Sequence, residues 1–411
     1  MVRDKFFWGW FILPLIFGVN SVCGQIIITV PDDVPTFAEA YEKAKNGDVI
    51  LLKAGEHTID ETLTIEKSVT FRGEAMDQVV VRSECDQVLN ISNGKSVFEQ
   101  ISFVSTGKDS LIWVTYGTPR FSDCLISAKN GIGVDIEARG LHLETLEEAE
   151  SLFERCQIVD CGLTGVRVYG GGALSRGAKF VSCKIYRNNN YCVHTTGPAN
   201  PQFIDCTIIA GNNLAIWASS QGQGIFRGCK IHSTNRENVL ADRDGALFFE
   251  DCHIEGGWVA VGCMSSGSVK LTGCRLYSRM YPVGCGTEGH CRLEKCEIQG
   301  QLGGIAATQG GTGHLSECRI EARDPQNGTA VGVHGKSRVN LQNCTIISPK
   351  YGVLLEAEAG GSFFNNQIEC PAEPWKISPN AGMTTGSGNT PEIPAAGESD
   401  FLKILMERTK K

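Results

Sequence analysis

Five polar and aromatic residues with complementary chemistry recur along the chain at spacings of 22 or 23 residues. The set contains two imidazoles, a carboxylate, a guanidinium and a phenol, namely His232, His253, Glu255, Arg275 and Tyr277. Arg275 could bind the carboxylate of an anionic sugar, and His253 or Glu255 could transfer a proton. His253, Glu255 and Arg275 are therefore candidate catalytic residues, and His232 and Tyr277 are candidate binding residues. A solvated face of alternating charges that stabilises neighbouring strands would explain the same pattern without a ligand.

A second group combines an aromatic pair with two acids. His194 and Trp217 are 23 residues apart and are candidate binding residues, because an exposed Trp217 could stack on a sugar ring. Asp242 and Asp244 flank Arg243, and paired aspartates suit Ca²⁺ binding or acid/base catalysis. Ca²⁺ is thus the one cofactor that the sequence suggests. A turn aspartate that pairs with Arg243 is the simpler interpretation.

These spacings follow a repeat that runs from about Ile101 to Ile368. Each repeat contains an apolar residue, two variable residues, a cysteine, one variable residue and then Ile or Leu. The ten cysteines of the repeat are Cys124, Cys156, Cys183, Cys206, Cys229, Cys252, Cys274, Cys296, Cys318 and Cys344. Apart from two longer early steps and one longer final step, they are separated by 22 or 23 residues. A constant period of this size indicates a solenoid.

The content of each period identifies the type of solenoid. Short alternating runs, such as Phe203 to Ile208 and Leu214 to Ala218, are separated by Gly, Asn and Ser, which is typical of strands and turns. About 22 residues suffice for one coil of short strands, and the crossover rule favours the right-handed form. We therefore predict an all-β fold, a right-handed single-stranded parallel β-helix of about 12 coils over residues 25–370.

The repeated cysteines are predicted to be buried free thiols. Cys and Ile alternate across one residue, so both side chains point inward. Parallel strands hold equivalent Cβ atoms about 4.8 Å apart, which exceeds the roughly 3.5 to 4.5 Å of a relaxed disulfide. A linear stack also gives no tetrahedral cage for a metal. We expect these thiols to pack as small apolar side chains.

The N-terminal residues 1–24 have the form of a secretory signal peptide. Arg3 and Lys5 precede an apolar run from Phe6 to Val19, and small residues follow it as far as Gly24. The run is short for a bilayer span, although an uncleaved membrane anchor is the alternative. The sequence therefore predicts a secreted, extracellular or periplasmic protein.

The first residues of the mature chain predict a helix that covers the open end of the β-helix. Thr36 to Glu39 form a capping box, and the helix is expected to end near Asn46. The segments Gly47-Asp48-Val49-Ile50 and Gly73-Glu74 follow it. With these motifs, the sequence resembles the pectin-lyase-like superfamily of right-handed β-helix proteins over roughly residues 26–370. The resemblance implies the fold and a polysaccharide as partner.

The motifs of individual enzyme families within this superfamily are incomplete. A mannuronan epimerase would carry Asp-Pro-His-Asp, but the chain has Asp324-Pro325-Gln326-Asn327. A polygalacturonase would carry Gly-His-Gly, but Gly289-His290 is followed by Cys291 and Gly313-His314 by Leu315. Calcium-dependent pectate lyases need several acids across adjacent coils, and only Asp242 and Asp244 approach that.

Two functions therefore remain open from the sequence. One is a secreted protein that binds an extracellular polysaccharide, either neutral or anionic, and in the enzymatic case processes it as a lyase, hydrolase or epimerase. The other is a non-catalytic cell-surface or structural binding module. The net charge of −8 argues against a nucleic-acid partner, and we expect a monomer.

Two segments depart from the repeat. The step from Cys124 to Cys156 holds about ten extra residues with the acidic run Leu141 to Glu150, and such insertions often lie beside a binding face. Residues 371–411 read as a linker or tail, within which residues 400–408 could form a final capping helix.

Overall fold

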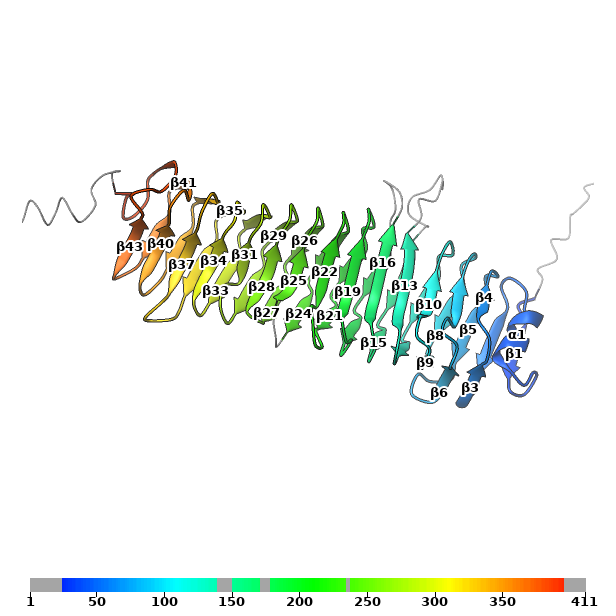
Figure 1. Cartoon of the computed structure of the whole chain (residues 1–411). Helices are drawn as coiled ribbons and strands as arrows, with labels where there is room; N and C mark the ends of the chain where they lie inside the picture. The colour runs from blue at the N-terminus through cyan, green and yellow to red at the C-terminus, as the bar shows by residue number, and fades with distance from the viewer. Residues whose placement is uncertain (1–23, 139–149, 171–177, 234–236, 395–411) are drawn as a thin grey trace, which may run out of the picture.

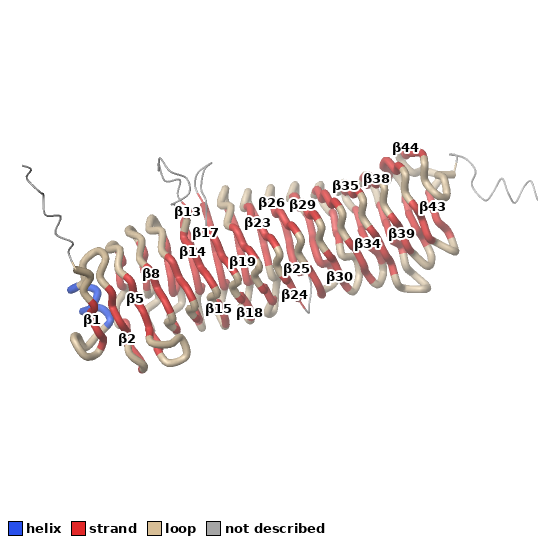
Figure 2. The backbone as a smooth tube through the Cα atoms, turned by 180° about the vertical axis from the view of Figure 1, so that it is seen from behind, coloured by secondary structure: helices blue, strands red, loops and turns tan. Residues whose placement is uncertain are grey.

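The computed structural model describes residues 24–138, 150–170, 178–233 and 237–394. These residues form a right-handed parallel β-helix, an elongated rod of stacked coils with the helix α1 at its N-terminal end (Figure 1). Strands from successive coils pair in parallel and in register along the whole rod (Figure 2). The predicted fold class is confirmed.

The strands of the described residues form three sheets that run the length of the rod, here called sheets A, B and C. The described part of sheet A consists of the 16 strands β1 (Ile27–Val30), β2 (Val49–Leu52), β5 (Thr70–Gly73), β8 (Val97–Glu99), β11 (Arg120–Ser122), β14 (Ser151–Glu154), β17 (Ala178–Val181), β20 (Gln202–Ile204), β23 (Gln223–Arg227), β26 (Ala246–Glu250), β29 (Ser268–Thr272), β32 (His290–Glu294), β35 (Thr312–Ser316), β38 (Arg338–Gln342), β41 (Gly360–Phe364) and β44 (Thr384–Ser387).

Sheet B has 14 strands: β3 (Gly55–Ile59), β6 (Val79–Ser83), β9 (Ser102–Ser105), β12 (Leu125–Ala128), β15 (Gln157–Val159), β18 (Lys184–Tyr186), β21 (Thr207–Ile209), β24 (Lys230–Ser233), β27 (His253–Gly256), β30 (Arg275–Ser278), β33 (Glu297–Gly300), β36 (Arg319–Ala322), β39 (Thr345–Ile347) and β42 (Gln367–Glu369). Sheet C also has 14: β4 (Leu63–Ile65), β7 (Leu89–Ile91), β10 (Ser110–Val114), β13 (Ile132–Ala138), β16 (Thr164–Gly170), β19 (Tyr191–Thr196), β22 (Ile216–Ser219), β25 (Glu237–Ala241), β28 (Val259–Cys263), β31 (Val283–Cys285), β34 (Gly303–Ala307), β37 (Thr329–Val333), β40 (Tyr351–Leu355) and β43 (Glu373–Ile377).

The number of coils is larger than the predicted figure of about 12, because the described parts of sheets B and C each hold 14 strands. The prediction was low because the first coils carry no repeat cysteine, although Phe71 and Phe98 already occupy the repeat's aromatic position. The sheets also continue beyond Cys370, where β43 pairs with β40 and β44 with β41.

A single residue turns the chain from sheet A to sheet B in each coil with a repeat cysteine. The residue before the cysteine has a left-handed backbone, for example Asp205 at φ 52° and Gly228 at φ 61°. Because one residue makes the corner, the cysteine and the following Ile both point into the rod. This geometry explains why the sequence spacing is so regular on this side of each coil.

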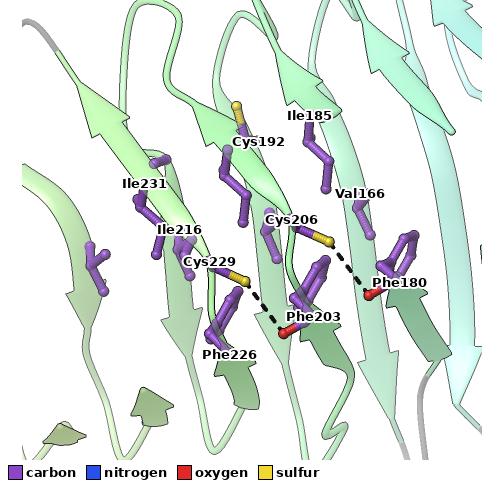
Figure 3. Close-up of a cluster of buried hydrophobic side chains, with 14 of the residues drawn as sticks. Val166, Phe180, Ile185, Cys192, Phe203, Cys206, Ile216, Phe226, Cys229 and Ile231 are labelled. Carbon is purple, nitrogen blue, oxygen red and sulfur yellow. Dashed lines mark hydrogen bonds between the residues drawn. The ribbon is translucent and has the colours of Figure 1, made fainter. Parts of the chain in front are cut away.

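The interior consists of parallel ladders of identical side chains. From Phe71 to Phe249, the repeated phenylalanines stack with ring centroids 4.4 to 4.9 Å apart. All ten repeat cysteines are buried and free, as predicted. Cys206 and Cys229 donate to the carbonyl oxygens of Phe180 and Phe203, each at 3.4 Å (Figure 3).

The predicted N-terminal cap is present as α1 (Phe37–Lys43). The Thr36 hydroxyl accepts a hydrogen bond from the Glu39 amide, and Phe37 stacks on Phe71 at 4.9 Å. Within the described residues, no helix is long and apolar enough to cross a bilayer. The predicted signal peptide through residue 23, most of the 141–150 insertion and the predicted 400–408 helix lie outside the described residues.

Candidate functional site

The structure brings the five residues of the first candidate group together on the outer surface of sheet B. His232 pairs in register with Glu255, and Glu255 with Tyr277. His253 pairs in the same way with Arg275. These residues, which we call the ion-pair strip, therefore occupy adjacent positions on β24, β27 and β30.

The polar groups of the ion-pair strip are partly or fully exposed: His253 contacts Glu255 within the strip, and Arg275 contacts Glu297 on the next strand of sheet B, β33. His253 Nε2 lies 3.1 Å from Glu255 Oε2, and Arg275 Nε lies 3.8 Å from Glu297 Oε2. The four side chains are 40 to 69% exposed, and exposed pairs of this kind contribute about 0 to 1 kcal/mol. The strip has the geometry of a solvated face of alternating charges.

Asp242 and Asp244 lie in the turn after β25, outside the strands that carry the ion-pair strip and outside those that carry His194 and Trp217. Asp242 Oδ2 accepts a hydrogen bond from Arg243 Nε at 3.2 Å, and Arg243 and Asp244 both have left-handed backbones. Across the ranges that the structure describes, no three His, Cys, Asp or Glu side chains converge as a metal site. The local turn and its ion pair account for this segment.

His194 and Trp217 form a parallel stack on the outer surface of sheet C. They are paired in register on β19 and β22, and their rings lie 4.4 Å apart with an interplanar angle of 8°. The ring of Tyr191 lies 4.9 Å from that of Trp217. Two of the four predicted binding residues, His194 and Trp217, therefore belong to a three-ring cluster.

An ion pair that sequence reasoning missed extends this cluster toward the N-terminus. Arg167 donates from Nε and Nη2 to the two carboxylate oxygens of Asp135, at 2.8 and 2.6 Å. The Ser110 hydroxyl donates to Asp135 Oδ2 at 3.0 Å. Asp135 is only 3% exposed, and Arg167 is 36% exposed. This is a half-buried, bidentate pair, which is the strong type of ion pair.

Two further aromatic residues flank the ion pair. Trp113 Nε1 donates to the Tyr169 hydroxyl at 3.2 Å, and the Arg167 guanidinium lies 5.4 Å from the centre of the Tyr169 ring. We call the whole surface the aromatic face. Its residues are Trp113, Asp135, Arg167, Tyr169, Tyr191, His194 and Trp217, on β10, β13, β16, β19 and β22.

The sequence carried a signal for the missed pair. Asp135, Arg167, His194 and Trp217 each follow a repeat cysteine by eleven positions, at Cys124, Cys156, Cys183 and Cys206. The structure confirms that these four residues form one continuous column of register partners. Counting from the cysteine removes the effect of the two longer repeat steps, because their extra residues follow Asp135 and Arg167 in the sequence.

Burial changes the proton affinity of two rings on the aromatic face. Burial and the nearby positive charge of Arg167 lower the pKa of His194 to about 4, so the imidazole is neutral at pH 7. Burial also raises the pKa of Tyr169 above its usual value. At neutral pH the face therefore presents uncharged rings around a neutralised ion pair.

Two buried polar atoms near the aromatic face lack a hydrogen-bond partner among the described residues. They are Trp217 Nε1 and Asn90 Oδ1, and Asn90 is the register partner of Trp113 on β7. An unsatisfied buried polar group costs about 1 to 3 kcal/mol and calls for an explanation. Ordered water or a ligand that settles on this face would relieve that cost.

One hollow on the surface of the rod lies away from these residues. It lies at β36, β39 and β42, is shallow, and is lined in part by Glu321, Arg323, Glu369 and Pro371. Glu321 already pairs there with Arg319 at 3.3 Å and with Arg323 at 3.0 Å. A second hollow lies on sheet A and is lined by different residues. The aromatic face is thus a ladder of stacked side chains outside both hollows.

The family model described as right handed beta helix region matches residues 139–276 and 281–370. The chain belongs to this family. A comparison with curated proteins finds no significant match.

The solved structures that are similar to this β-helix protein have low sequence identity to it. The catalytic unit of a GH87 α-1,3-glucanase from Streptomyces thermodiastaticus has a TM-score of 0.46 and 11% identity, with 89% of this chain and 68% of that chain covered. The ORF18 protein of Geobacillus virus E2 has a TM-score of 0.45 and 14% identity, with 77% of this chain covered. This chain spans 62% of the length of the viral protein.

A third similar structure is the A-module of a mannuronan C-5 epimerase from Azotobacter vinelandii, with a TM-score of 0.40 and 11% identity. The match covers 85% of this chain and 91% of the A-module. These scores concern the fold, and the function of this β-helix protein is argued below from its own residues.

Proposed function

We propose that this protein is an exported β-helix module that binds a polysaccharide on the aromatic face of sheet C. The observation that carries the proposal is the parallel stack of His194 and Trp217 beside the internally neutralised Asp135–Arg167 pair. Aromatic side chains supply a large apolar surface with polar edges. That combination suits a ligand such as a sugar, which has apolar ring faces and hydroxyl rims.

The arrangement of the aromatic face suits a chain rather than a single sugar. Its rings lie on strands of neighbouring coils, and successive coils are about 4.8 Å apart. Trp113 and Tyr169 stand at one end of the face, and Tyr191, His194 and Trp217 stand at the other. An oligosaccharide that lies along the rod can therefore contact both ring clusters.

The charges of the face favour a neutral polysaccharide over an anionic one. Both carboxylate oxygens of Asp135 accept from Arg167, and Ser110 donates to one of them. The pair has no net charge, so an anionic sugar would gain little attraction and would approach a carboxylate. Breaking the pair to free Arg167 would leave the Asp135 charge buried and uncompensated.

The same pairing favours binding without catalysis. Glycoside hydrolysis generally uses two carboxyl groups that flank the scissile bond, and Asp135 is engaged by Arg167. Glu137 also faces outward from β13, where it is the register partner of Tyr169. Glu137 is therefore the residue to change if turnover of a polysaccharide is detected.

Calorimetric titration with a panel of neutral and uronate-containing oligosaccharides tests the proposal. Trp217→Ala is expected to weaken the binding of a neutral oligosaccharide about fivefold, because it removes a stacking contact of about 0.5 to 1.5 kcal/mol. Trp258→Ala is the matched control, since Trp258 is an exposed tryptophan in a turn of another part of the rod. A neutral ligand that binds equally well to the wild type and to Trp217→Ala would contradict the proposal.

Export is a separate part of the proposal, supported by the form of residues 1–24. Expression of the full chain should yield a secreted product that begins near residue 25. A product that retains residues 1–24 in the membrane fraction would favour the uncleaved anchor instead.

A further inference from the structure

A second outward surface, on sheet A, combines basic side chains with an exposed ring. It is a hollow of about 240 Å³ whose lining includes Phe248, Lys270, His290, Arg292 and His314. We call this surface the cationic groove. It lies on β26, β29, β32 and β35, on a different sheet from the aromatic face.

Stacking of the coils aligns the groove along the rod. Phe248 pairs in register with Lys270, Lys270 with Arg292, and Arg292 with His314. Four consecutive coils therefore present a ring, an ammonium, a guanidinium and an imidazole in one column. All four side chains are exposed.

The two permanent charges of the groove are not neutralised by the surrounding acids. Neither Lys270 nor Arg292 forms an ion pair with another described residue. The carboxylates beside them on sheet A are engaged elsewhere: Glu250 pairs with Arg227 at 3.0 Å, and Glu294 with Lys295 at 3.8 Å. Like charges directly opposite each other on paired strands are destabilising, so an anion bound between Lys270 and Arg292 would stabilise the column.

His314 adds an N–H donor even when its ring is neutral. Asn340 Oδ1 accepts from the Ser362 amide at 2.9 Å and from the Ser362 hydroxyl at 2.7 Å. This orients the Asn340 amide group so that Nδ2 donates to His314 Nδ1 at 3.1 Å. Because Nδ1 accepts, the proton of the neutral ring sits on Nε2.

We propose that the cationic groove binds an anionic polysaccharide through its sulfate or phosphate groups, with Lys270, Arg292 and His314 as the donors. Donors from three coils suit an oxyanion with several acceptor oxygens, and guanidinium groups bind such oxyanions in a charge-assisted manner. Since the donors follow the rod axis, an extended ligand with repeated charges fits them better than one isolated ion. Phe248 provides an apolar surface for a sugar ring at one end of the column.

A polysaccharide is a better match than a nucleic acid or a membrane. The groove offers two permanent cations on a protein with a net charge of −8, whereas nucleic-acid affinity depends on neutralising many phosphates. Stable attachment to an anionic membrane likewise uses clusters of basic residues. The inference goes beyond the proposed function, because it concerns another sheet and a charged ligand.

The test compares two double variants that remove the same charge from different sheets. Lys270→Ala/Arg292→Ala removes the cations of the groove, and Lys184→Ala/Lys230→Ala removes two exposed lysines of sheet B. Binding of a sulfated oligosaccharide is measured by calorimetry at two salt concentrations. The groove variant should bind at least about tenfold more weakly and with a smaller salt dependence, because charge-assisted hydrogen bonds are lost. The control variant should bind like the wild type.

Three further probes identify the ligand class: a polyphosphate chain, single-stranded DNA and vesicles with anionic lipid. Binding of the sulfated oligosaccharide that only the groove variant loses supports the inference, whereas groove-dependent binding of polyphosphate without the sulfated oligosaccharide would overturn the polysaccharide as occupant. Equal losses in both double variants would show a non-specific charge effect and overturn it. Groove-dependent binding of DNA or vesicles alone would overturn the polysaccharide as occupant. Trp217→Ala should leave binding of the sulfated ligand unchanged, so a failure here is distinguishable from a failure of the proposed function.

Discussion

The aromatic face and the ion-pair strip are built by the same stacking of coils, yet they differ in how their charged groups are held. On the aromatic face, Asp135 is almost fully buried and both of its oxygens bind Arg167. On the ion-pair strip, His253, Glu255 and Arg275 lie in solvent and make longer or single contacts. A bidentate, half-buried pair is held in one geometry, whereas exposed pairs exchange readily with water.

This difference indicates which stacked column can serve as a preorganised site. The His194 and Trp217 rings lie parallel at 4.4 Å, and the pair formed by Asp135 and Arg167 fixes the neighbouring coils. The rings of His253 and Tyr277 are tilted by 33° and lie 5.4 Å apart. Rigid aromatic surfaces bind with a smaller loss of side-chain entropy, so we expect the aromatic face to be the better binding surface.

The largest expected effect comes from breaking the ion pair at the centre of the aromatic face. Arg167→Ala should lower the free energy of unfolding by about 3 kcal/mol or more, because it leaves a buried carboxylate without its partner. Arg275→Ala in the ion-pair strip should change it by less than about 1 kcal/mol. Denaturant unfolding followed by circular dichroism measures both. Equal losses in the two variants would remove the distinction between the faces.

A double variant provides the control for that experiment. Asp135→Asn/Arg167→Gln removes both charges and keeps polar side chains, so it should be less destabilised than Arg167→Ala alone. If the double variant is destabilised as much as Arg167→Ala, the loss reflects packing of the Arg167 side chain and not an uncompensated charge.

A smaller effect is expected from acid, which acts on His194. Its pKa is about 4 in the folded protein and about 6.5 in the unfolded chain. The unfolded state therefore binds a proton first as the pH falls. The contribution of neutral His194 to the free energy of unfolding is fully present above pH 6.5 and is lost as the pH falls toward 4. The loss is on the order of 3 kcal/mol.

His194→Gln checks this pH dependence. The wild type should lose stability between pH 6.5 and pH 4 more steeply than the variant does, when both are measured by denaturant unfolding. The imidazole resonances of His194 should titrate near pH 4 in an NMR experiment. Titration near pH 6.5 would show that the ring is solvated and that the aromatic face is more open than described.

The repeat predicted the fold because its Phe, Cys and Ile positions face inward in every coil. The register followed directly, so the pairing of Glu255 with Tyr277 and of His194 with Trp217 could be deduced from the spacing alone. The first coils were left out of the predicted coil number because they have no repeat cysteine. The left-handed turns before the cysteines could not be predicted either. Residues such as Arg155 and Lys295 adopt this backbone conformation, although the sequence has no glycine at these positions.

The spacing of the repeat could not show which column of outward-facing residues forms a preorganised site. The sequence shows that Arg275 and Arg167 both face outward, but it does not show that Asp135 is buried beneath Arg167 while the partner of Arg275 is exposed. Burial depends on neighbouring side chains, such as Ser110 and the flanking rings, and on the local shape of the sheet. The cationic groove was missed for a related reason, because its residues lie on the Phe-bearing strands and not beside the cysteines.

The most direct test of the central claim is an NMR titration of the tryptophan indole N–H groups with a neutral oligosaccharide that binds. Assignment uses Trp113→Phe, Trp217→Phe and Trp258→Phe variants. The resonances of Trp113 and Trp217 should shift in parallel with one dissociation constant, and that of Trp258 should stay in place. A shift of Trp258 alone, or binding that leaves both Trp113 and Trp217 unchanged, would contradict the assignment of the aromatic face as the polysaccharide-binding surface.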